Sequence, residues 1–160
     1  MTSSFASPPA PSALPRMLVR PFRPGDEDAC AGIFNRAWSA ALPDLPRRMD
    51  GREFLNQTRG EEILVAEADG RLLGFAAVHR PDAFIHHLFV EPAFHRRGVG
   101  GTLLDRALAL AGGSATLKCL RRNEGAWAFY ARAGWREVEQ GADEWGEWGR
   151  LAMRTGAADG

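Results

Sequence analysis

The order of predicted elements indicates an α/β protein, in which helices cover both faces of a mixed sheet. Three observations predict this class. Apolar residues recur at helical spacing over residues 29–38 and 99–111. Short apolar runs bounded by Gly, Pro and Asp lie before and between these segments, as strands would. Finally, a strand–helix–strand unit over residues 84–120 predicts a parallel pair of strands.

The first part of the chain is predicted to form one strand and two helices. Residues 18–22 are the strand, and Asp26 is expected to cap the helix that follows. Pro43 and Pro46 end this helix, because proline lacks the N–H that a helix interior needs. Asp50 is expected to begin a second, shorter helix.

The middle of the chain is predicted to supply most of the sheet. Residues 63–68 and 72–78 are strands joined at Asp69-Gly70, a strong hairpin signal. Residues 84–90 form a fourth strand, and residues 115–120 form a fifth strand parallel to it.

The last predicted elements close the sheet. A short helix begins at Asn123 as its N-cap and stops at Gly134. Residues 135–138 and 151–154 are then expected to pair as a hairpin.

Both ends of the chain are expected to lie outside the folded domain, which spans residues 17–155. Residues 1–16 are rich in Ser, Pro and Ala and do not resemble a signal peptide, so we expect a disordered tail. Residues 156–160 are expected to fray.

Composition excludes several classes of function. Twenty basic and twenty acidic residues cancel, and the pI is about 6.9, which argues against nucleic acid and membrane partners. Cys30 and Cys119 lie inside predicted elements, as buried thiols of a reducing, cytoplasmic compartment do. No metal-ligand spacing and no nucleophile–base pairing is visible, so we expect neither a metal nor a covalent intermediate.

Residues 88–101, LFVEPAFHRRGVGG, form the most informative segment of the chain. An apolar strand runs into a basic, glycine-rich turn that opens an apolar helix. Glycines leave no Cβ in the way, so successive N–H groups can point at one anion, and the helix N-terminus adds its free N–H groups. Arg96 and Arg97 supply positive charge beside the turn. The layout predicts a cradle for a pyrophosphate.

This segment resembles the acetyl-CoA loop of the Gcn5-related N-acetyltransferases (GNAT), whose signature is Gln/Arg-x-x-Gly-x-Gly/Ala. His95 stands where Gln or Arg is usual. Residues 123–135 are similar to the family's Asn-x-x-Ala-x-x-Phe-Tyr-x-x-x-Gly-Phe, with Trp135 in place of the last Phe. The resemblance covers about residues 18–152.

The resemblance implies a single-domain GNAT-like mixed sheet of six to seven strands with about four helices, splayed between the fourth and fifth strands. It also implies that acetyl-CoA is a co-substrate, with its pantetheine arm in the splay and a main-chain N–H near Val90 facing the thioester oxygen. The implied cofactor-binding residues are Leu88, Phe89, Val90, His95, Arg96, Arg97, Gly98, Val99, Gly100, Gly101, Asn123, Phe129 and Tyr130.

The resemblance also suggests catalytic residues. Tyr130, the only tyrosine, follows Asn123 by seven residues and is the candidate general acid. His86-His87-Leu88-Phe89-Val90 matches the His-x-Leu-x-Val of arylalkylamine acetyltransferases, so His86 is the preferred base and His87 the alternative. Strand alternation predicts that His86 shares a face with Leu88, and His87 with Phe89. A third reading is that no residue serves as an obligatory base.

Two further features concern the acceptor. Lys118 stands where ribosomal-protein N-terminal acetyltransferases carry a Glu base, which argues against that subgroup. Trp145 and Trp148 are candidates for the wall of an amine pocket or for a dimer contact; the alternative is a loop over 139–149 with half-covered tryptophans.

The sequence therefore predicts an acetyl-CoA-dependent N-acetyltransferase that acts by direct attack in a ternary complex, on a small-molecule amine. The alternatives are acetylation of a protein lysine or N-terminus, and a non-catalytic acyl-CoA-binding sensor. Either a monomer or a homodimer is expected.

Overall fold

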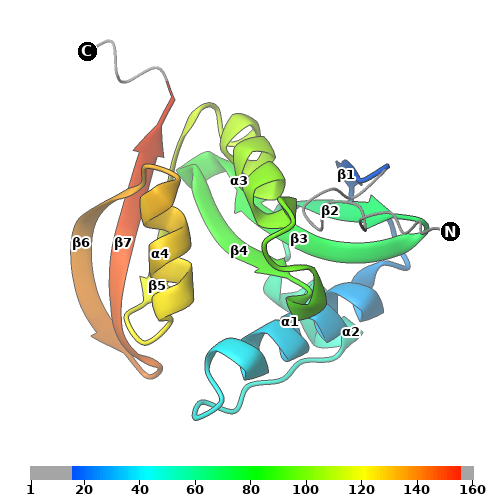
Figure 1. Cartoon of the computed structure of the whole chain (residues 1–160), viewed down its shortest axis with the longest axis horizontal. Coiled ribbons are helices and arrows are strands. Elements are labelled where there is room, and N and C mark those ends of the chain that lie inside the picture. The colour runs from blue at the N-terminus through cyan, green and yellow to red at the C-terminus, as the bar shows by residue number, and fades with distance from the viewer. Residues whose placement is uncertain (1–15, 156–160) are drawn as a thin grey trace, which may run out of the picture.

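Residues 16–155 are described by a computed structural model, and they form one seven-stranded sheet with four α-helices (Figure 1). The predicted tails, 1–16 and 156–160, lie outside the described residues except for Arg16. The strand order is β1-β2-β3-β4-β5-β7-β6, and only β4 and β5 pair in parallel. The predicted mixed sheet of six to seven strands with about four helices is confirmed.

The elements follow one another along the chain as β1 (Leu18–Pro21), α1 (Glu27–Ala41), α2 (Gly51–Gln57), β2 (Glu62–Ala68), β3 (Arg71–His79), β4 (Phe84–Val90), α3 (Val99–Leu110), β5 (Ser114–Leu120), α4 (Glu124–Arg132), β6 (Arg136–Asp143) and β7 (Gly146–Arg154), with short 3-10 turns at Arg80–Asp82 and Pro92–Phe94.

Most of the predicted turn and cap signals act as expected. Asp69 and Gly70 have φ angles of 53° and 76°, which suit a tight hairpin between β2 and β3. The Asp50 side chain accepts from the Glu53 N–H at 2.9 Å and begins α2. Asn123 likewise accepts from the Ala126 N–H, 3.2 Å away, and begins α4.

Asp26 stands at the N-cap of α1, but its side chain does not cap the helix. Its carboxylate instead accepts from the Arg23 N–H at 2.9 Å and from the Arg20 guanidinium at 3.0 Å. Arg20 also bonds to Glu67 on β2. Arg20 of β1 therefore takes the Asp26 carboxylate, which would otherwise accept from the first N–H groups of α1.

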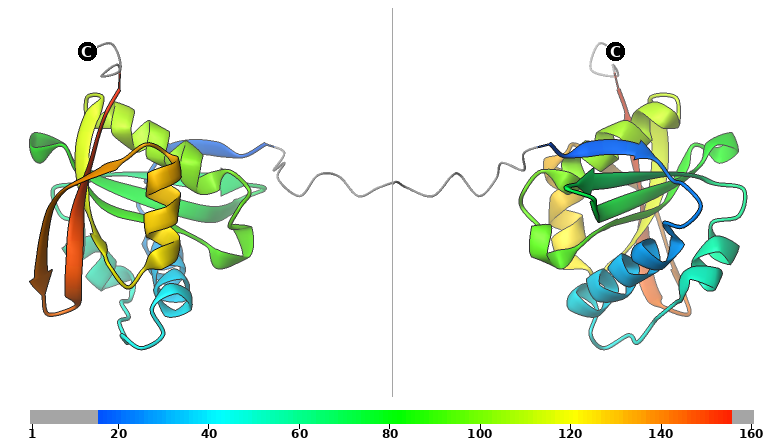
Figure 2. Two further views of the ribbon diagram at one scale, coloured as in Figure 1. Left: turned by 60° about the vertical axis from the view of Figure 1, so that its left-hand side comes forward. Right: turned by 90° about the vertical axis from the view of Figure 1, so that its right-hand side faces the viewer.

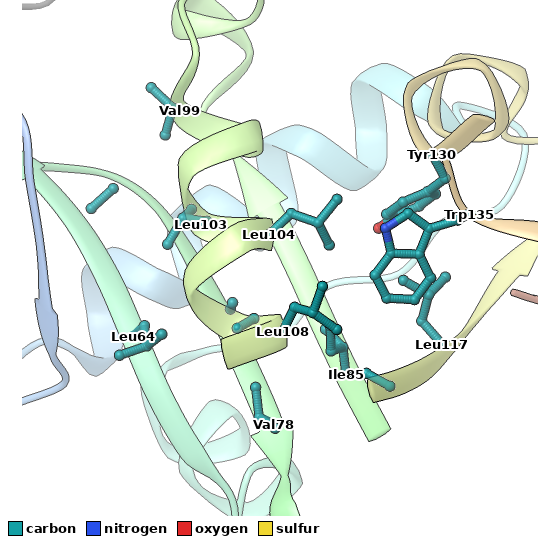
Figure 3. Packing of buried hydrophobic residues seen from close by; sticks show 14 of the residues in the cluster. Leu64, Val78, Ile85, Val99, Leu103, Leu104, Leu108, Leu117, Tyr130 and Trp135 are labelled. Atoms are coloured by element: carbon teal, nitrogen blue, oxygen red, sulfur yellow. The ribbon is translucent and has the colours of Figure 1, made fainter. Parts of the chain in front are cut away.

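Helices cover both faces of the sheet (Figure 2), and an apolar cluster lies on each face. One packs α3 and α4 onto the sheet, and Figure 3 shows Leu104 and Leu108 of α3 facing Ile85 and Leu117. The other cluster packs α1 and α2 against the opposite face and is rich in aromatic rings. Cys30 and Cys119 are buried in these clusters, as predicted.

The hairpin of β6 and β7 is longer than the sequence suggested. Residues 139–143 and 146–150 extend the two strands, and the turn falls at Glu144 and Trp145. Because almost every residue of β6 is exposed, the strand has no buried face to give it an alternating apolar pattern. Backbone pairing holds the segment in place instead.

The sheet splits between its two parallel strands. β4 and β5 pair only at Phe84 and Thr116, where the Thr116 N–H donates to the Ala83 carbonyl oxygen at 3.0 Å. Beyond this point the strands diverge, as Figure 1 shows. The β5-facing edge of β4 over residues 85–90 therefore has no strand partner within the described chain. The predicted splay is confirmed.

Candidate active site

A glycine-rich turn brings free N–H groups to the open end of the split. Gly98 has a φ of 85° and is the N-cap of α3, and Arg96 before it has a φ of 66°. The first bond within α3 runs from the Thr102 N–H to the Gly98 carbonyl oxygen at 3.1 Å. The N–H groups of Val99, Gly100 and Gly101 precede that bond, and no side chain caps them.

The turn has the space that an anion at these N–H groups requires. A Cβ built on Gly98 or Gly101 meets no atom within 4 Å, whereas one on Gly100 would contact Phe129 and Val90 at 3.4–3.5 Å. Unpaired N–H groups, the positive end of the α3 dipole and open space together fit a diphosphate.

The arginines beside the turn differ in how they are held. The Arg97 guanidinium lies over the Phe94 ring at 5.7 Å from its centroid. No ion pair is formed by Arg96 or Arg97 within residues 16–155, so both are free to meet a phosphate. His95 Nε2 lies 3.2 Å from the Val90 carbonyl oxygen and ties the turn to the end of β4.

An ion pair between exposed Arg36 and buried Glu91 fixes the end of β4 just before the turn. Glu91 is only 5% exposed, and its carboxylate accepts two-pronged bonds from Arg36 of α1 at 2.7–3.0 Å. Its own N–H donates to Leu73 at 2.7 Å. A shallow hollow of about 400 Å³ beside this pair is lined by Arg20, Asp26, Arg36, Arg71 and Glu91, and it lies on the far side of β3 from the split.

Tyr130 lies on α4, on the face of the sheet that α3 covers. Its ring packs against Trp135, whose centroid is 6.0 Å away (Figure 3), and against Phe129, whose centroid is 5.2 Å away. Burial raises the pKa of Tyr130, and the Cys119 thiol acts in the same direction, so the phenol keeps its proton at neutral pH. Within residues 16–155 its hydroxyl makes no hydrogen bond.

The two histidines of β4 lie on one face of the sheet, which corrects the prediction from strand alternation. The β3–β4 register shifts at Ala77 and Val78, which pair with His87 and Ile85, so that His86 is the extra residue of a β-bulge. The imidazole rings of His86 and His87 consequently stack, with centroids 4.0 Å apart.

The bulge also moves His86 away from the face of Leu88. Leu88, Val90 and Ile85 belong to the cluster beneath α3. His87 instead packs on Phe34, Phe75 and Phe89 on the α1 side. His86 follows His87 to this side, opposite the face that carries Tyr130.

A carboxylate that the sequence analysis missed holds His86. Glu61, in the turn before β2, approaches His86 Nδ1 to 2.8 Å with its Oε2. Its side chain is 9% exposed, and Oε1 has no hydrogen-bond partner within the described chain. The two residues are 25 positions apart, and no local pattern in the sequence links them.

His87 is held neutral by its surroundings. It is 5% exposed, and burial lowers its pKa well below the usual value, with His86 and Arg47 acting in the same direction. Its Nε2 is buried without a partner within residues 16–155. A neutral imidazole with a free nitrogen can accept a proton, but only at the expense of burying the charge.

The remaining candidates lie around the β6–β7 hairpin. Trp145, at the hairpin turn, packs edge-on against Trp38 of α1 at 5.8 Å. Trp148 instead lies beneath Lys118, whose Nζ is 4.6 Å from the ring centroid. Lys118 also pairs with Asp143 at 3.2 Å. Of the two tryptophans, Trp145 reaches the aromatic cluster beside the histidines.

The described residues contain neither a membrane-spanning helix nor a group of metal ligands. None of their helices is long and apolar enough to cross a bilayer. Across 16–155, no three His, Cys, Asp or Glu side chains gather in a group that would hold a metal ion.

The fold and the site together define a class of α/β protein: a mixed sheet that splits between its parallel strands, beside a glycine-rich helix start. Residues 28–135 match the model of the Acetyltransferase (GNAT) family. The chain belongs to this family, and the resemblance noted in the sequence is confirmed.

Curated relatives carry related names. The chain is 43% identical over 123 residues to a mycothiol acetyltransferase of Clavibacter sepedonicus, covering 70% of this chain and 37% of the relative. It is 34% identical over 105 residues to an uncharacterized N-acetyltransferase of Methanocaldococcus jannaschii, covering 54% and 44%. The chain thus spans less than half the length of these relatives.

Solved structures share the fold. A GCN5-related N-acetyltransferase from Rhodopseudomonas palustris superposes with a TM-score of 0.75 at 24% identity, covering 89% of this chain and 98% of the other. The PaiA N-acetyltransferase of Thermoplasma acidophilum, solved with coenzyme A, superposes with a TM-score of 0.67 at 16% identity, covering 84% and 97%. At these identities the likeness supports the fold alone.

Proposed function

We propose that this protein is an acetyl-CoA-dependent N-acetyltransferase that acts on a primary amine by direct attack in a ternary complex. The observation that carries the proposal is the split between β4 and β5, which opens beside the uncapped N–H groups of α3. An unpaired strand edge can bind an extended arm by strand addition, and a helix start can bind a diphosphate. Membership in the GNAT family supports the same function.

Acetyl-CoA supplies the thioester whose carbonyl the amine attacks. The N–H groups over residues 97–101 hold its diphosphate, with Arg96, Arg97 and His95 around them. The free edge of β4 at Leu88, Phe89 and Val90 lines the arm, and an N–H near Val90 polarises the carbonyl. Asn123 and Phe129 complete the binding wall from α4. The fit of the glycine turn to an anion supports this assignment.

Tyr130 returns a proton to the departing thiolate. The new C–N bond forms as the C–S bond breaks, and the phenol neutralises the sulfur. Burial raises the pKa of Tyr130, which keeps the phenol protonated at neutral pH but also makes it a weaker acid. The support for this role is the place of Tyr130 in the motif that begins at Asn123.

His86 takes the proton that the amine must lose, and His87 is the alternative base. Because Glu61 carboxylate oxygens only accept, Nδ1 of a neutral His86 carries the hydrogen, and Nε2 keeps its lone pair. The greater exposure of His86, 37% of its side chain, also suits exchange of protons with solvent.

Direct attack is favoured over a covalent enzyme intermediate. Cys30 and Cys119 are buried, and burial raises the pKa of each thiol to about 12. A buried, protonated thiol is a poor nucleophile. Neither cysteine is therefore suited to carry the acetyl group.

We propose a small-molecule amine as the acceptor. The similarity to mycothiol acetyltransferase, whose name specifies a small molecule, favours this class. A protein amine and a non-catalytic sensor are the alternatives. The pair of Tyr130 and His86 on opposite faces of one opening favours turnover over simple binding.

The function is tested with purified protein by calorimetry with acetyl-CoA and by thiol release over a panel of amines. We expect acetyl-CoA binding and amine-dependent thiol release, with mass spectrometry detecting the acetylated amine. Tight acetyl-CoA binding without thiol release would favour the sensor. Absence of acetyl-CoA binding would reject the proposed function.

A further inference from the structure

An arginine occupies a box of aromatic rings beside the two histidines. Arg47 lies in the segment between α1 and α2, and its guanidinium carbon is 4.9–5.1 Å from the ring centroids of Phe34, Trp38 and Trp145. Three rings around one guanidinium fix its plane and replace much of its water. The cation is therefore preorganised.

This guanidinium has no carboxylate partner among residues 16–155. Its single hydrogen bond runs from a terminal nitrogen to Gln57 Oε1 at 3.2 Å, which leaves most of its five N–H donors unused. Burial lowers the pKa of Arg47, although Glu144, Asp143 and Glu53 attract it from farther away.

Two of those three acids are already engaged with other groups. Glu53 accepts a hydrogen bond from Gln57 at 3.0 Å, and Asp143 accepts one from Lys118 at 3.2 Å. A partly desolvated cation without a direct counter-ion gains more from an incoming anion than a solvated surface arginine does.

The box lies where an acceptor would approach the proposed base. Phe34 and Trp38 come from α1, on the β4 side of the split, whereas Trp145 comes from the turn that follows β6, on the β5 side. Phe34 also packs on His87 and Phe89, with centroids 5.9 and 4.8 Å away. One ring thus separates Arg47 from the histidine pair.

We propose that Arg47 is a specificity-determining residue that binds a carboxylate on the acceptor, so that the acceptor is an amine bearing a carboxylate group. This inference rests on the proposed function. A planar guanidinium pairs with a carboxylate through two parallel N–H···O bonds, and the aromatic box holds it in the orientation that such pairing needs. The acceptor's amine then faces His86 and His87.

The test uses matched acceptors that differ only in the carboxylate. The acceptors are the proteinogenic L-amino acids, β-alanine and 4-aminobutyrate, each compared with its own carboxamide. Thiol release is measured for wild type, Arg47→Ala, Arg47→Lys and Arg48→Ala. Arg48 is the control, because it lies in the same segment but is exposed and forms no ion pair within residues 16–155. For each acceptor, kcat/KM for the carboxylate form is divided by kcat/KM for the carboxamide form. This ratio is then compared between wild type and each variant, so that the intrinsic reactivity of the amine cancels.

We expect Arg47→Ala to lower this ratio about 10- to 100-fold for the best acid, mainly through KM, because a charge-assisted pair is lost. Arg47→Lys should retain part of the preference, and Arg48→Ala all of it. Acetyl-CoA affinity should be unchanged in every variant.

Three outcomes would overturn the inference. In the first, Arg47→Ala lowers acid and amide equally. In the second, Arg47→Ala favours cationic amines, which would mean that Arg47 only fills a cation-binding box. In the third, acetyl-CoA binds but no carboxylate-bearing amine of the panel is acetylated by wild type. Loss of acetyl-CoA binding by wild type would instead reject the proposed function, and this inference with it.

Discussion

At the scale of single residues, the proposed acid and the proposed base lie on opposite faces of the sheet. Tyr130 lies among apolar rings beside α3, and the histidines lie on the opposite side, beside α1. The proposed function requires one ligand to meet both side chains at the split between β4 and β5. Each side chain can therefore be tested separately.

Replacement of Tyr130 by Phe should lower kcat about 100-fold or more while acetyl-CoA affinity stays within about twofold, because the ring remains and only the proton donor is lost. Steady-state kinetics and calorimetry check this. Thermal stability should change little, since the hydroxyl makes no hydrogen bond within residues 16–155. Unaltered kcat would remove Tyr130 as the acid.

Glu61 is expected to position His86. Glu61→Gln keeps the size of the side chain but replaces an acceptor that fixes the His86 tautomer, so kcat should fall by at least about tenfold. Glu62→Gln is the matched control, because Glu62 is a neighbour that pairs with Arg80 at the surface.

A structural role for Glu61 would give a different pattern. In that case the melting temperature and acetyl-CoA affinity would fall together with kcat. A positioning role predicts that both stay close to wild type and that the pH dependence of kcat changes shape. Equal kinetics for Glu61→Gln and Glu62→Gln would contradict the positioning role.

At the scale of elements, the start of α3 depends on backbone conformation more than on side chains. Gly98 turns the chain with a φ of 85° and leaves open space in front of three free N–H groups. A neighbouring arginine, Arg96, shares the left-handed region. The arrangement would be lost if the turn relaxed to ordinary helical angles.

Gly98→Ala should weaken acetyl-CoA binding about tenfold or more, because a Cβ at a positive φ strains the turn and narrows the space for the diphosphate. Calorimetry measures the affinity. Gly70→Ala is the control, since Gly70 also has a positive φ, 76°, and open space, but lies in the β2–β3 turn.

Both substitutions should lower stability by a similar amount, about 1 kcal/mol, because both place a side chain in the left-handed region. Only Gly98→Ala should lose affinity. If both variants bind acetyl-CoA as tightly as wild type, the α3 turn does not hold the diphosphate.

At the scale of the whole molecule, a buried histidine makes stability depend on pH. His87 has a lowered pKa in the folded state and an ordinary one, near 6.5, when unfolded. Below about 6.5 the unfolded chain therefore binds a proton that the folded chain does not, and folding stability falls as pH falls. Above that value the contribution of His87 is fully retained.

Chemical denaturation between pH 7.5 and 5 tests this. The wild-type free energy of unfolding should decline by up to about 1 kcal/mol per pH unit from this single group, whereas His87→Phe should show a shallower dependence. Parallel pH dependences in the two proteins would mean that His87 is protonated without penalty in the folded state.

The sequence predicted most of the fold because its signals were local. Asp69-Gly70, Asp50 and Asn123 each determine their turn or cap through neighbours a few positions away. The extended β6 lacked such a signal, because an exposed edge strand has no alternating apolar pattern. Asp26 was misjudged because its partner, Arg20, belongs to another element.

The site was predicted less completely, because its contacts are long-range. Glycines and Tyr130 stand in contiguous motifs that one sequence can reveal. The Glu61–His86 contact joins residues 25 positions apart, and the bulge that stacks His86 on His87 depends on pairing with β3. The aromatic box around Arg47 likewise assembles from α1, the segment after it and the β6–β7 turn.

The unpaired edge of β4 means that a bound acetyl-CoA would also stabilise the fold. The pantetheine arm of acetyl-CoA, bound along this edge, would take the place of a strand and pair with β4 between the two halves of the sheet. The melting temperature would then rise with co-substrate concentration, because the stabilisation grows as the logarithm of one plus the ratio of the free co-substrate concentration to Kd. Amide hydrogens over residues 85–90 would exchange slowly with solvent only while the arm is in place.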